Sequence, residues 1–187
     1  MIIAVALDNV VTTYIKTFQT YMAEMLNVSE EEIENVLPSD TTPDFENWQH
    51  VKEDLYSHQV QAFSKGILKT MSVADDASDV LWKLSNEGHH IRITTSRFLQ
   101  HGQNHKVIAH TGEWLDRNDI PYRDLVFIHD RTEVNADVYI EALPVNIKAF
   151  EESNRQHIVF NQPYNTNIET NLRAYGWKDV YTIINRI

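Results

Sequence analysis

Polar side chains whose chemistry suits a phosphate stand directly after three short apolar runs of this chain. In chain order they are Asp8 and Asn9, then Thr95, Ser96 and Arg97, and finally Glu141. Hydroxyl groups, backbone N–H groups and the guanidinium of Arg97 are donors that suit a phosphate. The carboxylates of Asp8 and Glu141 suit a hard cation such as magnesium. These residue types therefore predict a site for a phosphate, a cation or both.

Each of these residues also has a purely structural explanation. Asp8 is a common turn residue after a strand, and Glu141 could be a solvated strand end. The hydroxyls of Thr95 and Ser96 could cap a following helix. Their shared position favours a site, because ligands of open parallel sheets bind beyond the carboxyl ends of the strands, near the point where the strand order reverses.

The elements that would position these residues alternate along the chain. Apolar runs predict strands at residues 1–7, 90–94, 125–128, 138–140 and 158–160. Amphipathic patterns predict helices at residues 75–88, 107–118, 145–153, 167–175 and 179–187. Such alternation predicts an α/β fold with a parallel sheet that is covered by helices on both faces.

Residues 13–71 interrupt this alternation with helical patterns alone. The first pattern consists of Tyr14, Phe18, Tyr21, Met22 and Met25. A capping-box sequence follows at residues 29–32, then a loop at 38–43 and a second helical pattern at 51–68. We therefore predict a core domain of residues 1–12 and 72–187, with residues 13–71 as a helical insertion after the first strand.

Composition narrows the classes of function. The chain has 187 residues, 42% of them hydrophobic and 23% charged, which is ordinary for a globular protein. The net charge of -11 argues against partners such as nucleic acid or anionic membranes. The absence of cysteine excludes disulfides and thiolate chemistry, and the nine histidines lack metal-site spacing. The first apolar run is too short for a signal peptide or a membrane span, so we expect a cytoplasmic protein.

Several motifs resemble those of the haloacid dehalogenase (HAD) superfamily, and specifically of its 5'(3')-deoxyribonucleotidase family. The family's first motif, Asp-x-Asp-Gly-Val, corresponds to ALDNV at residues 6–10. Its second motif, Thr-Ser, corresponds to Thr95 and Ser96, and its acidic last motif corresponds to IEALP at residues 140–144. The run DRTEVNAD at residues 130–137 and FNQPYN at residues 160–165 extend the similarity over most of the second half of the chain.

The resemblance implies a Rossmann-like three-layer sheet with a small helical cap, a magnesium cofactor and hydrolysis of nucleoside monophosphates. It implies that the residue at the position of Ala6 attacks phosphorus and that Asp8 is the general acid/base. Asp8 and Glu141 would be the remaining magnesium ligands. The residues expected to bind phosphate are Asn9, Thr95, Ser96, Arg97 and Lys106. For the phosphate-side cation, Arg97 and Arg131 are alternatives to Lys106, because an alignment anchored on Trp114 places Thr111 there instead.

Two departures from the family pattern affect catalysis. Ala6 replaces the attacking aspartate, and Ala142 replaces the second acid of the last motif, which is normally a magnesium ligand. A methyl group can neither attack phosphorus nor bind a cation. We therefore expect that magnesium binding is weak or lost. Asn9 in place of the motif's glycine still permits a left-handed turn.

These departures leave three functional hypotheses. The first is a protein of the 5'-nucleotidase type that is inactive or strongly impaired and keeps a pocket for a nucleotide or another phosphate-bearing small molecule. The second is an active, magnesium-dependent phosphohydrolase of (deoxy)nucleoside monophosphates with a rewired site, in which Asp8 or Glu141 activates water directly, with or without the metal. The third is a non-catalytic module that binds a protein partner or a second copy of the chain through its cap, with Trp48 or Tyr56 as exposed contacts.

Overall fold

The computed structural model describes residues 1–29, 32, 55–97 and 104–187. Along the chain its elements are β1 (Ile2–Ala6), α1 (Tyr14–Leu26), α3 (Leu55–Ser64), η1 (Ile67–Lys69), α4 (Ala77–Asn86), β2 (His90–Thr95), α5 (Asn104–Arg117), β3 (Asp124–Phe127), η2 (Arg131–Glu133), β4 (Val138–Glu141), α6 (Pro144–Glu152), β5 (His157–Phe160), η3 (Pro163–Asn165), β6 (Arg173–Ala174) and α7 (Trp177–Ile184). Strands thus alternate with helices from residue 77 onward, as the apolar periodicity predicts.

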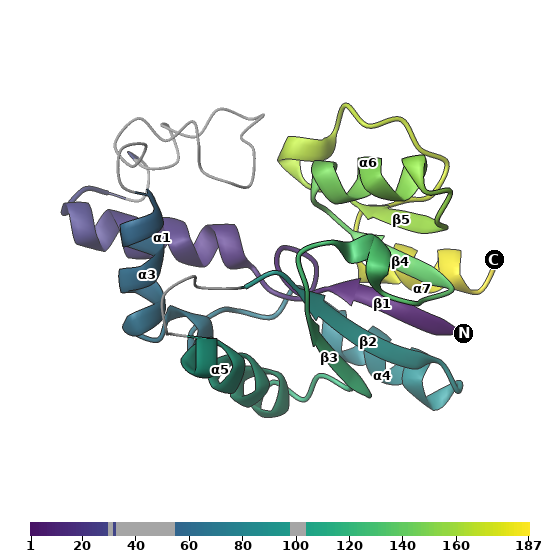
Figure 1. Ribbon diagram of the computed structural model, residues 1–187, viewed down its shortest axis with the longest axis horizontal. Helices are drawn as coiled ribbons and strands as arrows, with labels where there is room; N and C mark the ends of the chain where they lie inside the picture. Colours follow the sequence, from purple (N-terminus) through teal and green to yellow (C-terminus); the bar gives the residue numbers. More distant parts are fainter. Residues whose placement is uncertain (30–31, 33–54, 98–103) are drawn as a thin grey trace.

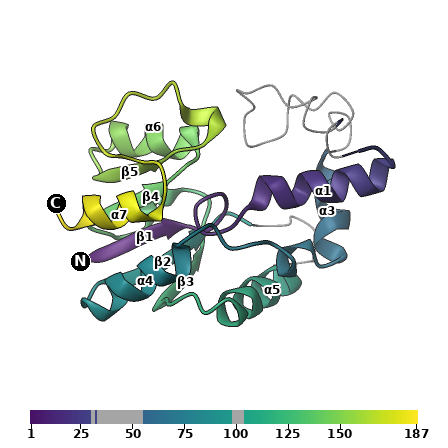
Figure 2. The same ribbon diagram turned by 180° about the vertical axis from the view of Figure 1, so that it is seen from behind.

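The six strands form one parallel sheet in the order β3-β2-β1-β4-β5-β6. Helix α6 lies on one face of the sheet in Figure 1, and Figure 2 shows α4 and α7 on the opposite face. The predicted α/β class with helices on both faces is therefore confirmed. The chain builds the sheet outward from β1 to β3 and then crosses to β4 on the other side of β1. The strand order consequently reverses between β1 and β4.

The apolar character of β1 follows from this central position. Its residues from Ile3 to Ala6 are all buried, and Ile3 pairs with Ile91 of β2 in register. A strand that is covered on both faces has no solvated side, which explains why it reads as a continuous apolar run rather than an alternating one.

The predicted helices of the core are mostly confirmed. Helix α4 buries Val80, Leu81 and Leu84, and the chain leaves it through Gly88 at a φ of +90°. Helices α5, α6 and α7 occupy the predicted segments, with ends shifted by a few residues. Among the helices that the structure describes, none is long and apolar enough to cross a bilayer.

The helix predicted at residues 167–175 is wrong. This segment contains the edge strand β6, where the carbonyls of Leu172, just before the strand, and of Ala174 within it accept the N–H groups of Val159 and Asn161, both at 2.8 Å. Pairing with β5 satisfies these backbone groups, whereas only a few apolar residues in the segment indicate a helix. A two-residue strand is too short to show an alternating pattern in the sequence, so the sixth strand is not predicted.

Asn165 holds the loops after β4 and β5 together. Its fully buried amide donates to the carbonyls of Ala142 and Phe160, at 2.8 and 2.9 Å, and its Oδ1 accepts the N–H of Gln162 at 3.0 Å. The side chain therefore fixes the geometry of the rim beside Glu141, since each of these backbone groups depends on it.

We expect Asn165→Ala to lower the free energy of unfolding by about 3 kcal/mol, because each buried polar group left without a partner costs about 1–3 kcal/mol. Urea denaturation followed by circular dichroism measures the change. The exposed Asn167 of the same loop provides the control, since Asn167→Ala should change stability by less than about 0.5 kcal/mol. Equal stability of the two variants would show that the amide network is dispensable.

The described parts of the predicted insertion are helical. Helix α1 buries Phe18 and Met22, and α1 and α3 lie together beyond the end of the sheet in both views. Where the segment leaves and rejoins the core, the N–H of Thr13 donates to the carbonyl of Ser72 at 3.0 Å. The domain boundaries at residues 12 and 72 remain a prediction that fits this pairing.

The local predictions within this insertion have mixed outcomes. The capping box is confirmed, since the N–H of Ser29 donates to the Glu32 carboxylate at 2.8 Å and the N–H of Glu32 donates to Ser29 Oγ at 3.1 Å. The second helix is shorter than predicted, because α3 ends at Ser64 and η1 is separate. The loop at residues 38–43, the start of the helical pattern at residues 51–54, and Trp48 lie outside the described residues.

Candidate functional site

The carboxyl ends of β1, β2 and β4 meet where the strand order reverses, and the predicted site residues gather there. Asp8 follows β1, Thr95 and Arg97 come from the end of β2, and Glu141 ends β4. Asp8 is hydrogen-bonded to Thr95, whose Oγ1 donates to Asp8 Oδ2 at 3.2 Å. The side chains that follow β1 and β2 are therefore brought together.

Asp8 and Arg97 form a two-pronged ion pair. The Nε of Arg97 donates to both carboxylate oxygens of Asp8 at 2.9 Å, and its Nη2 donates to Oδ1. The side chain of Arg97 is only 3% exposed, and that of Asp8 is 26% exposed. A bidentate guanidinium–carboxylate pair of this kind is among the stronger polar contacts in proteins. Both oxygens of Asp8 are thus engaged.

Arg97 is built into the core rather than extended into solvent. Its backbone N–H donates to Thr95 Oγ1 at 3.2 Å, its Nη1 donates to Thr111 Oγ1 at 3.3 Å, and its Nη2 reaches the Sδ of Met71 at 3.1 Å. The carbonyl of Met71 in turn accepts from the fully buried indole of Trp114 at 2.8 Å. Contacts on several sides therefore fix the guanidinium against Asp8.

The turn after Asp8 depends on Asn9. Asn9 adopts the left-handed conformation with a φ of 59°, the turn that an asparagine at this place in the motif still permits. Its Oδ1 accepts the N–H of Ile15 at 3.0 Å, near the start of α1, and its carbonyl accepts from Gln162 Nε2 at 2.7 Å. The asparagine thus supplies the turn that a glycine would supply, and it also ties β1 to α1 and to the end of β5.

Glu141 is turned back onto its own chain. Its Oε1 accepts the N–H groups of Ala142 and Leu143, at 2.8 and 3.1 Å, and its Oε2 accepts from Asn146 Nδ2 at 2.8 Å. These donors lie at the amino end of α6, where backbone N–H groups favour a negative charge. Glu141 is only 4% exposed, and these donors at the start of α6 stabilise its carboxylate in place of water.

Arg131, in η2, is a second buried guanidinium close to these carboxylates. It is 7% exposed, and its Nε and Nη1 have no hydrogen-bond partner among the described residues. Burial lowers the pKa of Arg131, whereas the charges of Glu141 and Asp8 act in the opposite direction. An arginine stays protonated under these conditions, so a buried positive charge here lacks a full set of acceptors.

Comparison with known proteins assigns the chain to a family. The sequence model for "5' nucleotidase, deoxy (Pyrimidine), cytosolic type C protein" matches residues 1–187. The chain belongs to this 5'-nucleotidase family. A protein of Chlorobaculum tepidum described as a "putative 5'(3')-deoxyribonucleotidase" is 33% identical over 150 residues, which cover 79% of this chain and 74% of that protein.

Solved structures agree with the family at the level of the fold. A "predicted phosphatase" from Clostridium acetobutylicum superposes with a TM-score of 0.68 at 11% identity, over 99% of this chain and 98% of the other. A haloacid dehalogenase-like hydrolase from Streptococcus pneumoniae gives 0.62 at 12% identity, over 97% of each chain. The chain therefore shares the fold of HAD-like hydrolases, and the family match confirms the resemblance to the 5'(3')-deoxyribonucleotidase family that the motifs indicate.

The two alanines that depart from the 5'-nucleotidase motifs lie at this rim. Ala6 is the last residue of β1, and Ala142 directly follows β4; they are 3% and 1% exposed. Both are packed in the main hydrophobic core. The positions where the resemblance expects an attacking carboxylate and a metal-binding carboxylate therefore hold methyl groups surrounded by apolar side chains.

The donor set at the rim does not fit the magnesium ion that members of this superfamily usually use. Magnesium demands oxygen ligands in a near-octahedral arrangement. Both oxygens of Asp8 already accept from Arg97, and both oxygens of Glu141 accept from the start of α6. Across the described residues, no group of three acidic or histidine side chains is placed to hold a metal ion. A cation would also lie close to two guanidinium groups.

The predicted phosphate-binding residues are distributed unequally. Thr95 and Arg97 lie in the cluster, and Asn9 shapes the adjoining turn. Ser96 is exposed, and Lys106 is an exposed residue in the first turn of α5. Burial lowers the pKa of nearby His110, and the charges of Lys69 and Lys106 add to this effect. Lys106 is therefore placed on the outer surface of α5, whereas Arg131 lies beside the carboxylates.

Two further residues belong to the cluster. The alignment anchored on Trp114 places Thr111 at the position of the phosphate-side cation, whereas sequence reasoning gives Tyr164 no role beyond its place in FNQPYN. Thr111 is completely buried and contacts Arg97. Tyr164 is buried beside the Asn9 side chain, and burial together with the charge of Glu141 raises the pKa of its phenol. A hydroxyl on a helix and a tyrosine in a loop are common features, so only the fold reveals that they converge on Asp8 and its turn.

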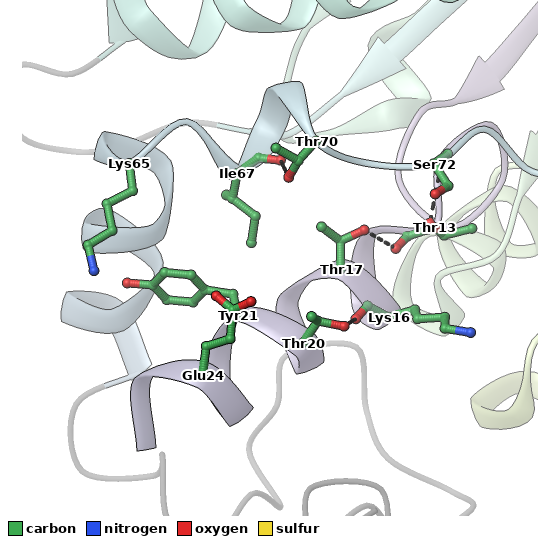
Figure 3. Close-up of a pocket in the computed structure, with 10 residues that line it drawn as sticks. All are labelled: Thr13, Lys16, Thr17, Thr20, Tyr21, Glu24, Lys65, Ile67, Thr70 and Ser72. Atoms are coloured by element: carbon green, nitrogen blue, oxygen red, sulfur yellow. Dashed lines mark hydrogen bonds between the residues drawn. The ribbon is translucent and has the colours of Figure 1, made fainter. Parts of the chain in front are cut away.

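A separate cavity of about 550 Å³ lies between α1 and the segment from Lys65 to Ser72 (Figure 3). Its walls carry hydroxyl groups, and Lys16 and Lys65 line it as well. The hydroxyls of Thr17 and Thr70 donate to backbone carbonyls, at 3.0 and 2.9 Å. The four charged side chains of the rim do not line this cavity, which is therefore distinct from the candidate site. These four residues are Asp8, Arg97, Arg131 and Glu141.

Proposed function

We propose that this member of the 5'-nucleotidase family binds the phosphate of a nucleoside monophosphate at the rim and does not hydrolyse it at a useful rate. The observation that carries the proposal is Ala6, a buried methyl group where the family resemblance expects the attacking carboxylate. Neither cysteine nor a serine next to Asp8 is available in the sequence as a substitute nucleophile.

The expected loss of turnover follows from the effect of removing the covalent nucleophile in other enzymes. Removing a covalent nucleophile reduces turnover by roughly 10^4- to 10^6-fold. The missing carboxylate at Ala142 removes a second, independent contribution, because the metal that neutralises the transferring phosphoryl group would lose a ligand. Because the site lacks both the attacking carboxylate and a metal-binding carboxylate, we favour a protein that binds without hydrolysis over an enzyme that turns over slowly.

Retention of phosphate binding is supported by the donors that remain. They belong to Arg131, which follows β3 and whose Nε and Nη1 have no hydrogen-bond partner among the described residues, whereas the Thr95 hydroxyl and the Arg97 guanidinium already donate to Asp8. Arg131 thus follows the carboxyl end of a strand, where ligands of such sheets bind. Fewer carboxylates also mean less repulsion of a phosphate. Within this proposal Arg131 takes the role of the phosphate-side cation in place of Lys106, because it is buried beside Asp8 and Glu141.

The rewired hydrolase receives no comparable support. A carboxylate that activates water needs a free oxygen within hydrogen-bond reach of that water. Arg97 holds both oxygens of Asp8, and Ala142, Leu143 and Asn146 hold those of Glu141. The protein-binding module likewise lacks a favouring observation, since Trp48 and the Tyr56 side chain lie outside the described residues.

Titration calorimetry against a panel of nucleoside monophosphates tests the proposal. We expect at least one of them to bind, with the heat of a single site, and to be recovered intact at the end of the titration. The corresponding nucleosides should bind at least about tenfold more weakly, because each charge-assisted hydrogen bond to phosphate contributes about 1.5–3 kcal/mol. Equal binding of nucleosides, or no binding by any monophosphate, would contradict the proposal.

A further inference from the structure

We infer that the anion site of this chain works without a metal ion, and that Arg131 supplies the positive charge that magnesium supplies elsewhere in the superfamily. The inference rests on the proposed function, because it concerns how the same rim holds a phosphate. It is carried by the contacts of the four charged side chains at the rim, Asp8, Arg97, Arg131 and Glu141.

The first step concerns the carboxylates, which already have their partners. A cation could take Asp8 only by displacing the guanidinium of Arg97, whose other donors hold it against Thr111 and Met71. It could bind Oε1 of Glu141 only by displacing the two N–H groups at the start of α6, and Oε2, which accepts from Asn146 Nδ2, would offer it a single lone pair. Each displacement leaves buried donors without acceptors, which costs about 1–3 kcal/mol per group.

The second step concerns Arg131, which is the one rim charge without a direct partner among the described residues. Its Nε and Nη1 are buried and make no hydrogen bond there, although Asp8 and Glu141 lie near enough to influence its pKa. Arg97 and the amino end of α6 occupy the oxygens of those two carboxylates, which favour the charge of Arg131 without a hydrogen bond to its Nε or Nη1. The buried guanidinium is consequently left with two donors that lack acceptors, and the oxygens of an anion supply them.

The third step identifies the chemistry of that anion. A phosphate group offers several acceptor oxygens to the fixed donors of a guanidinium, which is why arginine is common in phosphate sites. The short η2 helix that carries Arg131 is itself fixed, because the Asp130 carboxylate accepts the N–H of Thr132 at 2.8 Å. A preformed donor of this kind needs no metal to position the ligand.

Calorimetric titration of the full chain with inorganic phosphate, at constant ionic strength, tests the inference. One series contains a chelator such as EDTA, and the other contains excess magnesium. We expect the two dissociation constants to agree within about twofold. In the chelator series, Arg131→Met should weaken phosphate binding by at least about tenfold, because it removes charge-assisted hydrogen bonds.

Matched variants make the result specific. Arg131→Lys keeps the charge but not the planar donors, so its affinity should lie between those of the wild type and Arg131→Met. Arg123→Met removes an exposed arginine eight positions earlier in the chain and should leave the affinity unchanged. Thermal unfolding without phosphate checks that each variant is folded. We expect Arg131→Met to be at least as stable as the wild type, because it removes buried donors that lack partners.

The possible outcomes separate the inference from the function on which it rests. Phosphate binding that requires magnesium would overturn the inference and leave the proposed function intact. Unchanged binding by Arg131→Met would overturn the assignment to Arg131. Absence of phosphate binding in both series would overturn the inference and the phosphate-binding function together.

Discussion

Replacing Asp8 by asparagine is expected to lower the free energy of unfolding by about 3–5 kcal/mol. The substitution leaves the guanidinium of Arg97, whose side chain is 3% exposed, without a countercharge in the core. Breaking a buried ion pair by removing one partner typically costs this much, because the remaining charge is neither solvated nor paired. Urea denaturation followed by circular dichroism measures the change.

The opposite substitution should cost less, and this asymmetry makes the prediction specific. Arg97→Met leaves the Asp8 side chain, which is 26% exposed and hydrogen-bonded to Thr95, so water can reach the remaining charge. We expect a loss of about 1–3 kcal/mol, and the double variant should be more stable than Asp8→Asn alone.

Exposed Asp75 provides the control for these variants, since Asp75→Asn should change stability by less than about 0.5 kcal/mol. An acid kept for catalysis behaves differently, because functional groups are commonly retained at a cost in stability. If Asp8→Asn were as stable as the wild type or more so, Asp8 would not be the structural partner of Arg97.

The second large effect concerns turnover. We expect phosphate release from any mononucleotide to be at least about 10^4-fold slower than for an active 5'-nucleotidase of the family, with or without magnesium, because Ala6 offers no nucleophile. A colorimetric phosphate assay measures the rate, and Asp8→Asn that is shown to be folded gives the background. Release by the wild type well above that background would favour the rewired hydrolase.

Restoring the nucleophile alone should not restore this activity. In Ala6→Asp the attacking carboxylate returns, yet Asp8 stays paired with Arg97 and position 142 still lacks a metal ligand. We therefore expect its turnover to remain within about tenfold of the background in the same assay. A gain of several orders of magnitude would show that the ion pair opens readily and that Asp8 can still act as an acid or base.

Most of the fold could be predicted because the central strands are buried on both faces. Residues 1–7 are apolar without interruption for that reason, and Gly88 marks the end of α4 through a backbone conformation that glycine favours. Strand β6 could not be predicted, since its pairing with β5 depends on contacts between segments rather than on local periodicity. The same reason explains the false helix at residues 167–175.

The candidate site could be predicted in its residues but not in its contacts. Asp8, Thr95 and Glu141 stand at strand ends in the sequence, so the sheet alone brings them to one rim. The sequence does not reveal that Arg97 binds Asp8 or that Glu141 turns toward α6, because both depend on side-chain directions. The importance of Arg131 over Lys106 follows from burial, which no local pattern encodes.

Binding without hydrolysis is tested most directly by phosphorus NMR of the wild-type chain mixed with the mononucleotide that binds best in calorimetry. We expect the phosphate-monoester resonance to shift or broaden on addition of protein and to keep its full intensity over many hours, with chelator or with magnesium. A growing resonance of inorganic phosphate that depends on the wild-type chain would contradict the loss of the attacking carboxylate as the defining feature of this site.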